Sequence, residues 1–383
     1  NTAIGFRALK SFEADTDGHG NNTAVGANAG ENISTGTENV AIGLQAIGTG
    51  ITTGNNNIAV GVSAGLSLSS GSDNICIGSY AGDAINTGAK NVAIGRSALG
   101  SEDAHGKVVA IGYAALNAQN AGADSYNTAV GYAAGLAVTT GVENTIIGGL
   151  AGDALTTGSS NVALGYNALS TEDAHGRNIA IGSSALTTLN AGADAYNIAI
   201  GFNAGYAVTT GVRNTVIGGL AGDALTTGNY NTAIGYTALG AENAHGKNVA
   251  IGYAALAVQD AGADAYNVAI GFEAGLSVTT GTQNTIVGAQ AGDALTTGHF
   301  NVAVGYLALS AEDDHGRNVA VGKGALQLLN AGADGYNTAV GNLAGTAMTT
   351  GTHNTILGGL AGDALTTGGA NVAIGYKTLS DET

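Results

Sequence analysis

The chain of 383 residues contains no proline, no tryptophan and a single cysteine, Cys76. One cysteine cannot close a disulfide within the chain, and Cys76 stands where related segments carry Ala or Ile, so we expect a buried free thiol. No run of about 18 apolar residues occurs, so no transmembrane helix is predicted. The sequence begins at Asn1 without a signal-like segment, so we expect targeting elements to be absent or to lie outside this segment.

Basic residues are also scarce, because 11 Lys and Arg stand against 28 Asp and Glu, which gives a net charge of −17. Such an excess of negative charge repels phosphate backbones and anionic lipids, and the Lys and Arg residues occur singly. We therefore expect no nucleic-acid partner and no membrane contact within this segment. Charged residues make up only 10% of the chain, yet its mean hydropathy is +0.18, which argues against disorder.

The sequence is rich in glycine, with 65 residues, and in the motif Asn-x-Ala-aliphatic-Gly. The motif divides the chain into 22 units, which start at residues 1, 22, 39, 57, 74, 91, 108, 127, 144, 161, 178, 197, 214, 231, 248, 267, 284, 301, 318, 337, 354 and 371. From residue 108 the spacings run 19, 17, 17 and 17 and then repeat. The diverged units at 1-107 are therefore followed by four 70-residue super-repeats, at 108-177, 178-247, 248-317 and 318-383.

Repeats of this kind bury their apolar faces only against their neighbours, and they leave no room for a separate catalytic domain. We therefore predict that the protein is not an enzyme and has no catalytic residues. The apolar stretch of a unit, such as Asn-Val-Ala-Ile-Gly at 91–95, is β-branched and ends at Gly, which indicates a short strand and a turn. A second apolar stretch follows, as at 134–138, and Thr-Thr-Gly at 139–141 closes the unit. These features predict an all-β fold, a parallel β-solenoid (β-roll) of about 22 short coils.

The alternation of side chains predicts what fills each coil. With the leading Asn numbered zero, positions one and three are Val, Ile, Thr or Leu, whereas position two is mainly Ala and position four is always Gly. Position seven is Ala in every unit except the last, which has Thr378. Because alternate residues of a strand face opposite sides, Ala and Gly can fill a narrow interior while the aliphatic row faces outward. An exposed row of that length needs a partner, which predicts a parallel homotrimeric rod. The competing geometry places Ile and Val inside a wider single-chain coil and needs no oligomer.

The units Asn-Val-Ala-Ile-Gly-x-x-Ala, for example at 91–98 and 248–255 and in part at 371–376, resemble the head repeats of YadA-like trimeric autotransporter adhesins. Similar runs occur in phage tail-fibre proteins, and the resemblance covers the whole chain. It implies a left-handed parallel β-roll in a parallel homotrimer, engaged in adhesion on a bacterial surface or a phage tail. The units here are longer than most head units of that family. The family motifs are structural, so the resemblance transfers no catalytic residue.

One polar cluster recurs once in every four coils. The run Glu-Asp-Ala-His-Gly-Lys at 102–107 is echoed three times at 70-residue intervals, and the Asp17-Gly18-His19-Gly20 segment is a distant relative. Histidine beside carboxylates can ligate a divalent metal, but a polar turn with a charged tip explains the same residues. The histidines of these clusters are His105, His175, His245 and His315.

A second set of candidates for Ca²⁺, bound between coils, comprises Asp153, Asp223, Asp293 and Asp363, together with the Gly-Ala-Asp residues Asp124, Asp194, Asp264 and Asp334. They lack the dense carboxylate spacing of a calcium loop. The sequence therefore predicts no cofactor, and Ca²⁺ or another divalent metal is the alternative.

Three further rows of residues carry structural or binding alternatives. The leading Asn, present in 21 of 22 units and replaced by Val108 in the other, predicts a ladder of amides along the stack. Paired threonines, as at 139–140 and 156–157, are either glycan acceptors or plain turn residues. One tyrosine per super-repeat precedes a leading Asn and either packs over the longer coil or offers an aromatic row to sugars and proteins. These tyrosines are Tyr126, Tyr196, Tyr266 and Tyr336.

Together these features predict a structural and adhesive fibre segment that is extracellular, on a cell surface or on a virion. Its expected partner is itself, in a homotrimer or a filament, with a surface glycan or a host protein as the bound target. One alternative is a bacteriophage tail-fibre shaft or receptor-binding segment. Another is a secreted, glycan-coated filament protein.

Overall fold

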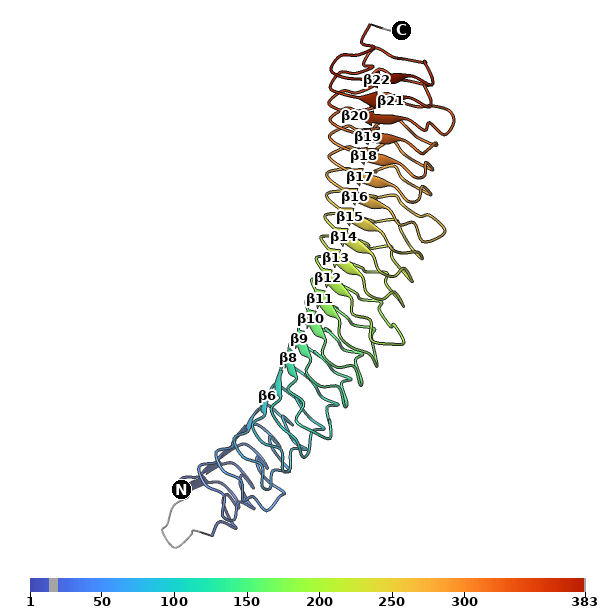
Figure 1. Ribbon diagram of the computed structural model, residues 1–383. Helices are drawn as coiled ribbons and strands as arrows, with labels where there is room; N and C mark the ends of the chain where they lie inside the picture. Colours follow the sequence, from blue (N-terminus) through green and yellow to red (C-terminus); the bar gives the residue numbers. More distant parts are fainter. Residues whose placement is uncertain (14–19, 382–383) are drawn as a thin grey trace. The chain divides into compact units, whose positions relative to one another are not determined.

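The computed structural model describes residues 1–13 and 20–381. The chain forms two compact units, Asn1–Ala195 and Tyr196–Thr383, and each is a stack of short coils with one strand per coil (Figure 1). The fold is an all-β parallel solenoid with 22 strands of three residues each, and no helix occurs in the described ranges. The sequence prediction of a solenoid with about 22 coils is therefore confirmed.

The strands of the first unit are β1 (Thr2–Ile4), β2 (Thr23–Val25), β3 (Val40–Ile42), β4 (Ile58–Val60), β5 (Ile75–Ile77), β6 (Val92–Ile94), β7 (Val109–Ile111), β8 (Thr128–Val130), β9 (Thr145–Ile147), β10 (Val162–Leu164) and β11 (Ile179–Ile181). Those of the second unit are β12 (Ile198–Ile200), β13 (Thr215–Ile217), β14 (Thr232–Ile234), β15 (Val249–Ile251), β16 (Val268–Ile270), β17 (Thr285–Val287), β18 (Val302–Val304), β19 (Val319–Val321), β20 (Thr338–Val340), β21 (Thr355–Leu357) and β22 (Val372–Ile374).

Within each unit, every strand pairs in parallel with the strand of the next coil, and equivalent positions face each other. In the first unit Val162, Ala163 and Leu164 pair with Ile179, Ala180 and Ile181, and the strands of the second unit pair in the same way. Hydrogen bonds between coils continue beyond the strands, since the backbone N–H of Gly152 donates to the carbonyl of Ala168 at 2.9 Å. Each coil thus satisfies its backbone polar groups through its two neighbours.

The interior of each coil is narrow, as the alternation of side chains predicts. The position-two alanines, such as Ala93 and Ala163, are fully buried, and so are the position-seven alanines, such as Ala98 and Ala168. Positions one and three lie outside the coil, where Leu164 is 40% exposed. The competing geometry, with the Ile and Val of positions one and three inside a wider coil, is therefore wrong, because the inner face of the strand is occupied by the residue at position two, which is mainly alanine.

The larger interior side chains change place from coil to coil. The coil with Ala163 at position two has Leu169 at position eight, whereas the coil with Ile146 at position two has Gly152 at position eight. A Cβ atom on Gly152 would lie 2.9 Å from the Leu155 side chain and 3.5 Å from that of Ile146. Large and small residues therefore alternate so that the interior volume stays filled.

The leading asparagines form the predicted ladder inside the stack. The Asn144 N–H donates to Asn127 Oδ1 at 2.8 Å, and Asn144 Nδ2 donates to the carbonyl of Gly158 at 2.8 Å. Both ends of the amide are thus used in the 17-residue coils. In the 19-residue coil that starts at Asn248, the Nδ2 atom is buried without a partner. In the coils of the same length that start at Asn178 and Asn318, Nδ2 donates at 3.2 Å to the carbonyls of Gly176 and Gly316, and Val108 starts a further coil of this length.

We expect a leading asparagine whose Nδ2 has an acceptor to contribute more to stability than Asn248, whose Nδ2 has none. Asn284→Val removes the 2.8 Å hydrogen bond from Nδ2 to the Gly298 carbonyl and the 2.9 Å bond that Oδ1 accepts from the Asn301 N–H, so it should lower the free energy of unfolding by about 2–3 kcal/mol. Asn248→Val removes only the longer 3.2 Å bond that Oδ1 accepts from the Asn267 N–H, together with the unpaired Nδ2, and should cost less than about 1 kcal/mol. Thermal unfolding of both variants checks the difference, and equal losses would contradict it.

The position-four glycines are set by close contact between coils. Gly165 has φ +136°, and a Cβ atom there would lie 2.5 Å from the carbonyl oxygen of Gly182 in the next coil. Gly192 has φ +69° and has nothing within 4 Å of its Cβ position. We expect Gly165→Ala to destabilise the protein by about 3 kcal/mol or more through strain and overlap, and Gly192→Ala by about 1 kcal/mol through strain alone. Denaturant unfolding measures both, and similar losses would show that contact between coils is not the cause.

Candidate functional site

The described residues enclose no pocket, so candidate functional features are faces and turns of the coils. In the same ranges, no helix combines the length and the hydrophobicity that crossing a bilayer would require. Three features stand out: an outward aliphatic row, groups of aromatic and charged residues beside it, and a buried Glu–His turn.

The outward aliphatic row consists of the side chains at positions one and three of the strands. Its most exposed members away from the terminal coils are about two-fifths exposed, as for Leu164 at 40% and Ile270 at 38%. The remaining members are mostly half-buried, because each side chain packs against its equivalents in the coils above and below. Within each unit, the row presents apolar atoms in every coil.

An aromatic row follows the aliphatic one at position five, directly after the position-four glycine, and sequence reasoning missed it. Tyr113 stacks on Tyr132 with ring centroids 5.3 Å apart, and Tyr253 stacks on Tyr236 at 5.8 Å and on Phe272 at 5.2 Å. These rings are about half exposed. The signal was present in the sequence, because aromatic residues recur at position five, but the position also holds Gly, Ser, Ala and Lys.

The predicted tyrosine row is exposed, and its members combine with a cation and a carboxylate. Lys107 Nζ lies 2.6 Å from Asp124 Oδ2 and 3.0 Å from the Tyr126 hydroxyl, and it also lies over the Tyr126 ring. The hydrogen bond with Asp124 raises the pKa of Lys107, and the same bond lowers the pKa of Asp124. Equivalent ion pairs recur in the other super-repeats, between Arg177 and Asp194, Lys247 and Asp264, and Arg317 and Asp334.

The Glu–His turn is the most unusual of these features, because its glutamate is buried. Glu102 occupies position eleven, where other coils place a buried aliphatic residue such as Leu155, and its side chain is fully buried. Its Oε1 accepts a hydrogen bond from the His105 N–H at 3.0 Å, and His105 Nδ1 lies 3.7 Å from the same oxygen. The reading of this segment as a charged turn tip is therefore wrong for the glutamate.

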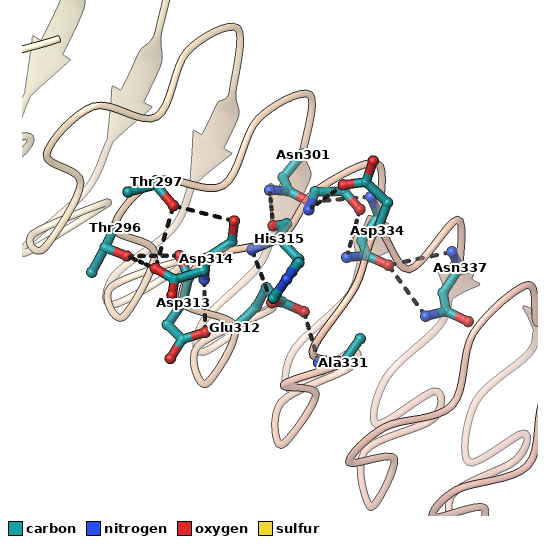
Figure 2. A network of polar contacts seen from close by, with 12 residues as sticks. Thr296, Thr297, Asn301, Glu312, Asp313, Asp314, His315, Ala331, Asp334 and Asn337 are labelled. Atoms are coloured by element: carbon teal, nitrogen blue, oxygen red, sulfur yellow. Dashed lines mark hydrogen bonds and ion pairs between the residues drawn. The ribbon is translucent and has the colours of Figure 1, made fainter.

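Figure 2 shows the fourth copy of the turn. The Glu312 carboxylate accepts hydrogen bonds of 3.3 Å from the backbone N–H groups of His315 and Ala331, and Ala331 belongs to the next coil. Desolvation by burial raises the pKa of Glu312, and the two backbone hydrogen bonds oppose that rise. The pKa values of Glu172 and Glu242 are raised by desolvation as well. The turn therefore holds an acidic group that the interior disfavours in its charged form.

The structure brings each predicted histidine together with two carboxylates. The groups whose possible ligand atoms all lie within 4.8 Å of one another are Glu102, Asp103 and His105; Glu172, Asp173 and His175; Glu242, His245 and Asp260; and Glu312, Asp313 and His315. Asp153, Asp223, Asp293 and Asp363 belong to none of the groups found among the described residues. Asp17 and His19 lie outside the described residues.

The remaining candidates have contacts that fit a structural role. Thr156 Oγ1 donates to the Asp173 carbonyl of the next coil at 2.8 Å, and Thr139 Oγ1 donates to the Thr156 carbonyl at 3.1 Å. The Cys76 thiol is buried, as predicted. Desolvation, with a smaller effect from the Asp83 charge, raises its pKa to about 12, so the thiolate is disfavoured at neutral pH.

No family model, no curated protein and no solved structure matches the chain. The functional argument therefore rests on the residues and on the geometry above.

The partly buried aspartates at position nine predict how stability depends on pH. Desolvation raises the pKa values of Asp83, Asp153, Asp223 and Asp293 above their ordinary value of about 4. A carboxyl group with a raised pKa in the folded state favours folding most below its unfolded pKa, and this contribution is lost as the pH rises through the folded value. These groups should therefore make the protein more stable near pH 4 than near pH 7.

The variant with Asp153→Asn, Asp223→Asn and Asp293→Asn removes three of the four charges. We expect its midpoint of thermal unfolding at pH 7 to exceed that of the original protein, and its gain on acidification to pH 4 to be smaller. Thermal unfolding at several pH values in the presence of a chelator tests this. An unchanged dependence on pH would contradict the assignment.

Proposed function

We propose that this chain is a structural and adhesive segment of an extracellular fibre, borne on a cell surface or on a virion, and that it works as a parallel homotrimer without catalysis. The observation that carries the proposal is the outward aliphatic row, which is present in each unit and which none of the described residues covers. A continuous apolar surface of this kind is unfavourable in water and is typical of an interface.

A trimer suits this row because the side chains at positions one and three lie on the outer face of the strand in every coil. Three parallel copies can place equivalent residues of each coil at one level around an axis, so that one arrangement repeats along the stack. A contact whose rotation closes after three copies also limits association to three chains, whereas a contact whose rotation does not close would continue without an end. The resemblance to trimeric adhesin heads supports the same assembly.

The adhesive part of the proposal is supported by the groups of tyrosine, cation and aspartate on the surface. Tyr126, Tyr266 and Tyr336 are about half exposed, and each lies beside a basic residue that is paired with a carboxylate. Such groups offer aromatic surface and hydrogen bonds to a glycan or a protein. Their recurrence once in each super-repeat favours many weak contacts made together.

The oligomeric state tests the structural part of the proposal. Analytical ultracentrifugation of the original chain should give three times 37.1 kDa, about 111 kDa. The double variant Leu164→Lys and Ile270→Lys places two charges in the aliphatic row and should sediment as a monomer. The matched control is Ser160→Lys, at a position where Lys90 and Lys247 occur in other coils, and it should remain a trimer. A monomeric original chain would overturn the trimer.

Binding of the intact fibre segment to arrays of surface glycans and extracellular proteins tests adhesion. Alanine at Tyr126, Tyr196, Tyr266 and Tyr336 should lower the binding at least about tenfold while the sedimentation stays unchanged. Retained binding in that variant would exclude these tyrosines as the adhesive surface.

A further inference from the structure

The histidines of the four Glu–His turns share a feature that hydrogen bonding within the protein does not explain. The Nδ1 atoms of His105, His175, His245 and His315 are all buried, and none has a hydrogen-bond partner in the described part of the chain. Each lies 3.6 or 3.7 Å from Oε1 of a fully buried glutamate. Hydrogen bonds between nitrogen and oxygen are shorter, about 2.7–3.2 Å, so these four nitrogens face an acceptor that they do not reach.

The same spacing suits two ligands of one metal ion. Ligands that lie about 2.0–2.1 Å from a tetrahedral ion are about 3.3 Å from each other, so a small shift of the histidine ring brings both atoms into range. The fully buried Glu242 also has an Oε2 atom without a partner, which adds a second unused ligand atom in that copy. Both unused atoms belong to groups that ligate metals well.

Each of the four copies also has a third possible ligand, a carboxylate, which comes from one of two neighbouring positions. In three copies it comes from the residue after the glutamate, namely Asp103, Asp173 and Asp313, and the facing residue of the next coil is Asn120, Asn190 or Asn330. In the remaining copy the two residue types are exchanged. There Asn243 follows the glutamate, and Asp260 of the next coil supplies the carboxylate.

The exchange keeps one carboxylate within 4.8 Å of the Glu and His ligand atoms in all four copies, although its origin differs. Asn243 Nδ2 donates to Asp260 Oδ2 at 3.2 Å, which shows that the two positions adjoin. A hydrogen bond between an amide and a carboxylate would account for the pairing of Asn with Asp. It would not account for the unpartnered histidine nitrogen, which the three-ligand arrangement does explain.

We propose that each Glu–His turn binds a divalent transition-metal ion such as Zn²⁺ through the glutamate, His Nδ1 and the third carboxylate. The site with Asp260 would join two consecutive coils directly, because its ligands come from both coils. The other three sites would join consecutive coils through the buried glutamate. The second oxygen of that glutamate accepts a hydrogen bond from a backbone N–H of the next coil, at Ala121, Ala191 or Ala331. Ca²⁺ fits less well, because it takes oxygen ligands and an imidazole nitrogen is a poor substitute. The ions would fasten the stack at 70-residue intervals.

Asn243 and Asp260, where the other copies have Asp and Asn, allow a test that separates metal binding from folding. The full-length chain is stripped with a chelator and titrated with Zn²⁺ by isothermal titration calorimetry, with Ca²⁺ as the comparison ion. Asp260→Asn should weaken one Zn²⁺ site at least about tenfold, because its third ligand is lost. The double variant Asn243→Asp and Asp260→Asn rebuilds the arrangement of the other three copies and should restore that site.

His353→Gln is the matched control, since His353 stacks on Tyr336 outside the four groups, and it should leave the Zn²⁺ binding unchanged. Asp260 is exposed, so circular dichroism should show the same fold for all variants. Absorption of the Co²⁺-loaded chain reports the geometry at the metal. The proposal is overturned if the stripped chain binds no Zn²⁺, if Asp260→Asn binds as the original does, or if the double variant fails to regain the lost site.

Discussion

The narrow interior of the coil is the constraint on which the rest of the structure depends. Consecutive coils approach so closely at position four that a Cβ atom on Gly165 would overlap the backbone of the next coil. Position seven and most position-two residues are then limited to alanine. The strand has only two faces, so the larger aliphatic residues must lie outside. The apolar outer row is thus a consequence of the packing within each coil.

Most of the leading asparagines inside this stack are satisfied by the coil geometry. They use both ends of their amides in coils of 17 residues, whereas Asn248, which starts a longer coil, has a buried Nδ2 without a partner. The buried glutamates are a different case. They stand at an interior position that other coils fill with leucine, at a desolvation cost that the two backbone hydrogen bonds reduce. Buried carboxylates beside histidine nitrogens that have no hydrogen-bond partner are a reason to consider a ligand.

The repeat made the fold predictable to an unusual degree. The spacing of the Asn-x-Ala-aliphatic-Gly motif located all 22 strands, and the alternation of small and large residues correctly assigned the inner and outer faces. The candidate sites were less predictable. The sequence identifies the histidines, but neither interpretation of their segment, a metal site or a polar turn with a charged tip, places the glutamate in the interior, where the structure has it. The aromatic row at position five was missed because its ring stacking depends on register between coils.

By itself, the sequence determined the parallel solenoid, the length of its coils and the alanines that line its interior, because each follows from a local pattern repeated without interruption. Only the tertiary structure decided which polar residues meet. Asp260 and Glu242 are 18 residues apart and belong to different coils, yet they lie beside one histidine because stacking places equivalent positions side by side. Contacts of that kind depend on the turn geometry and on the register of the stack, which local residue preferences do not specify.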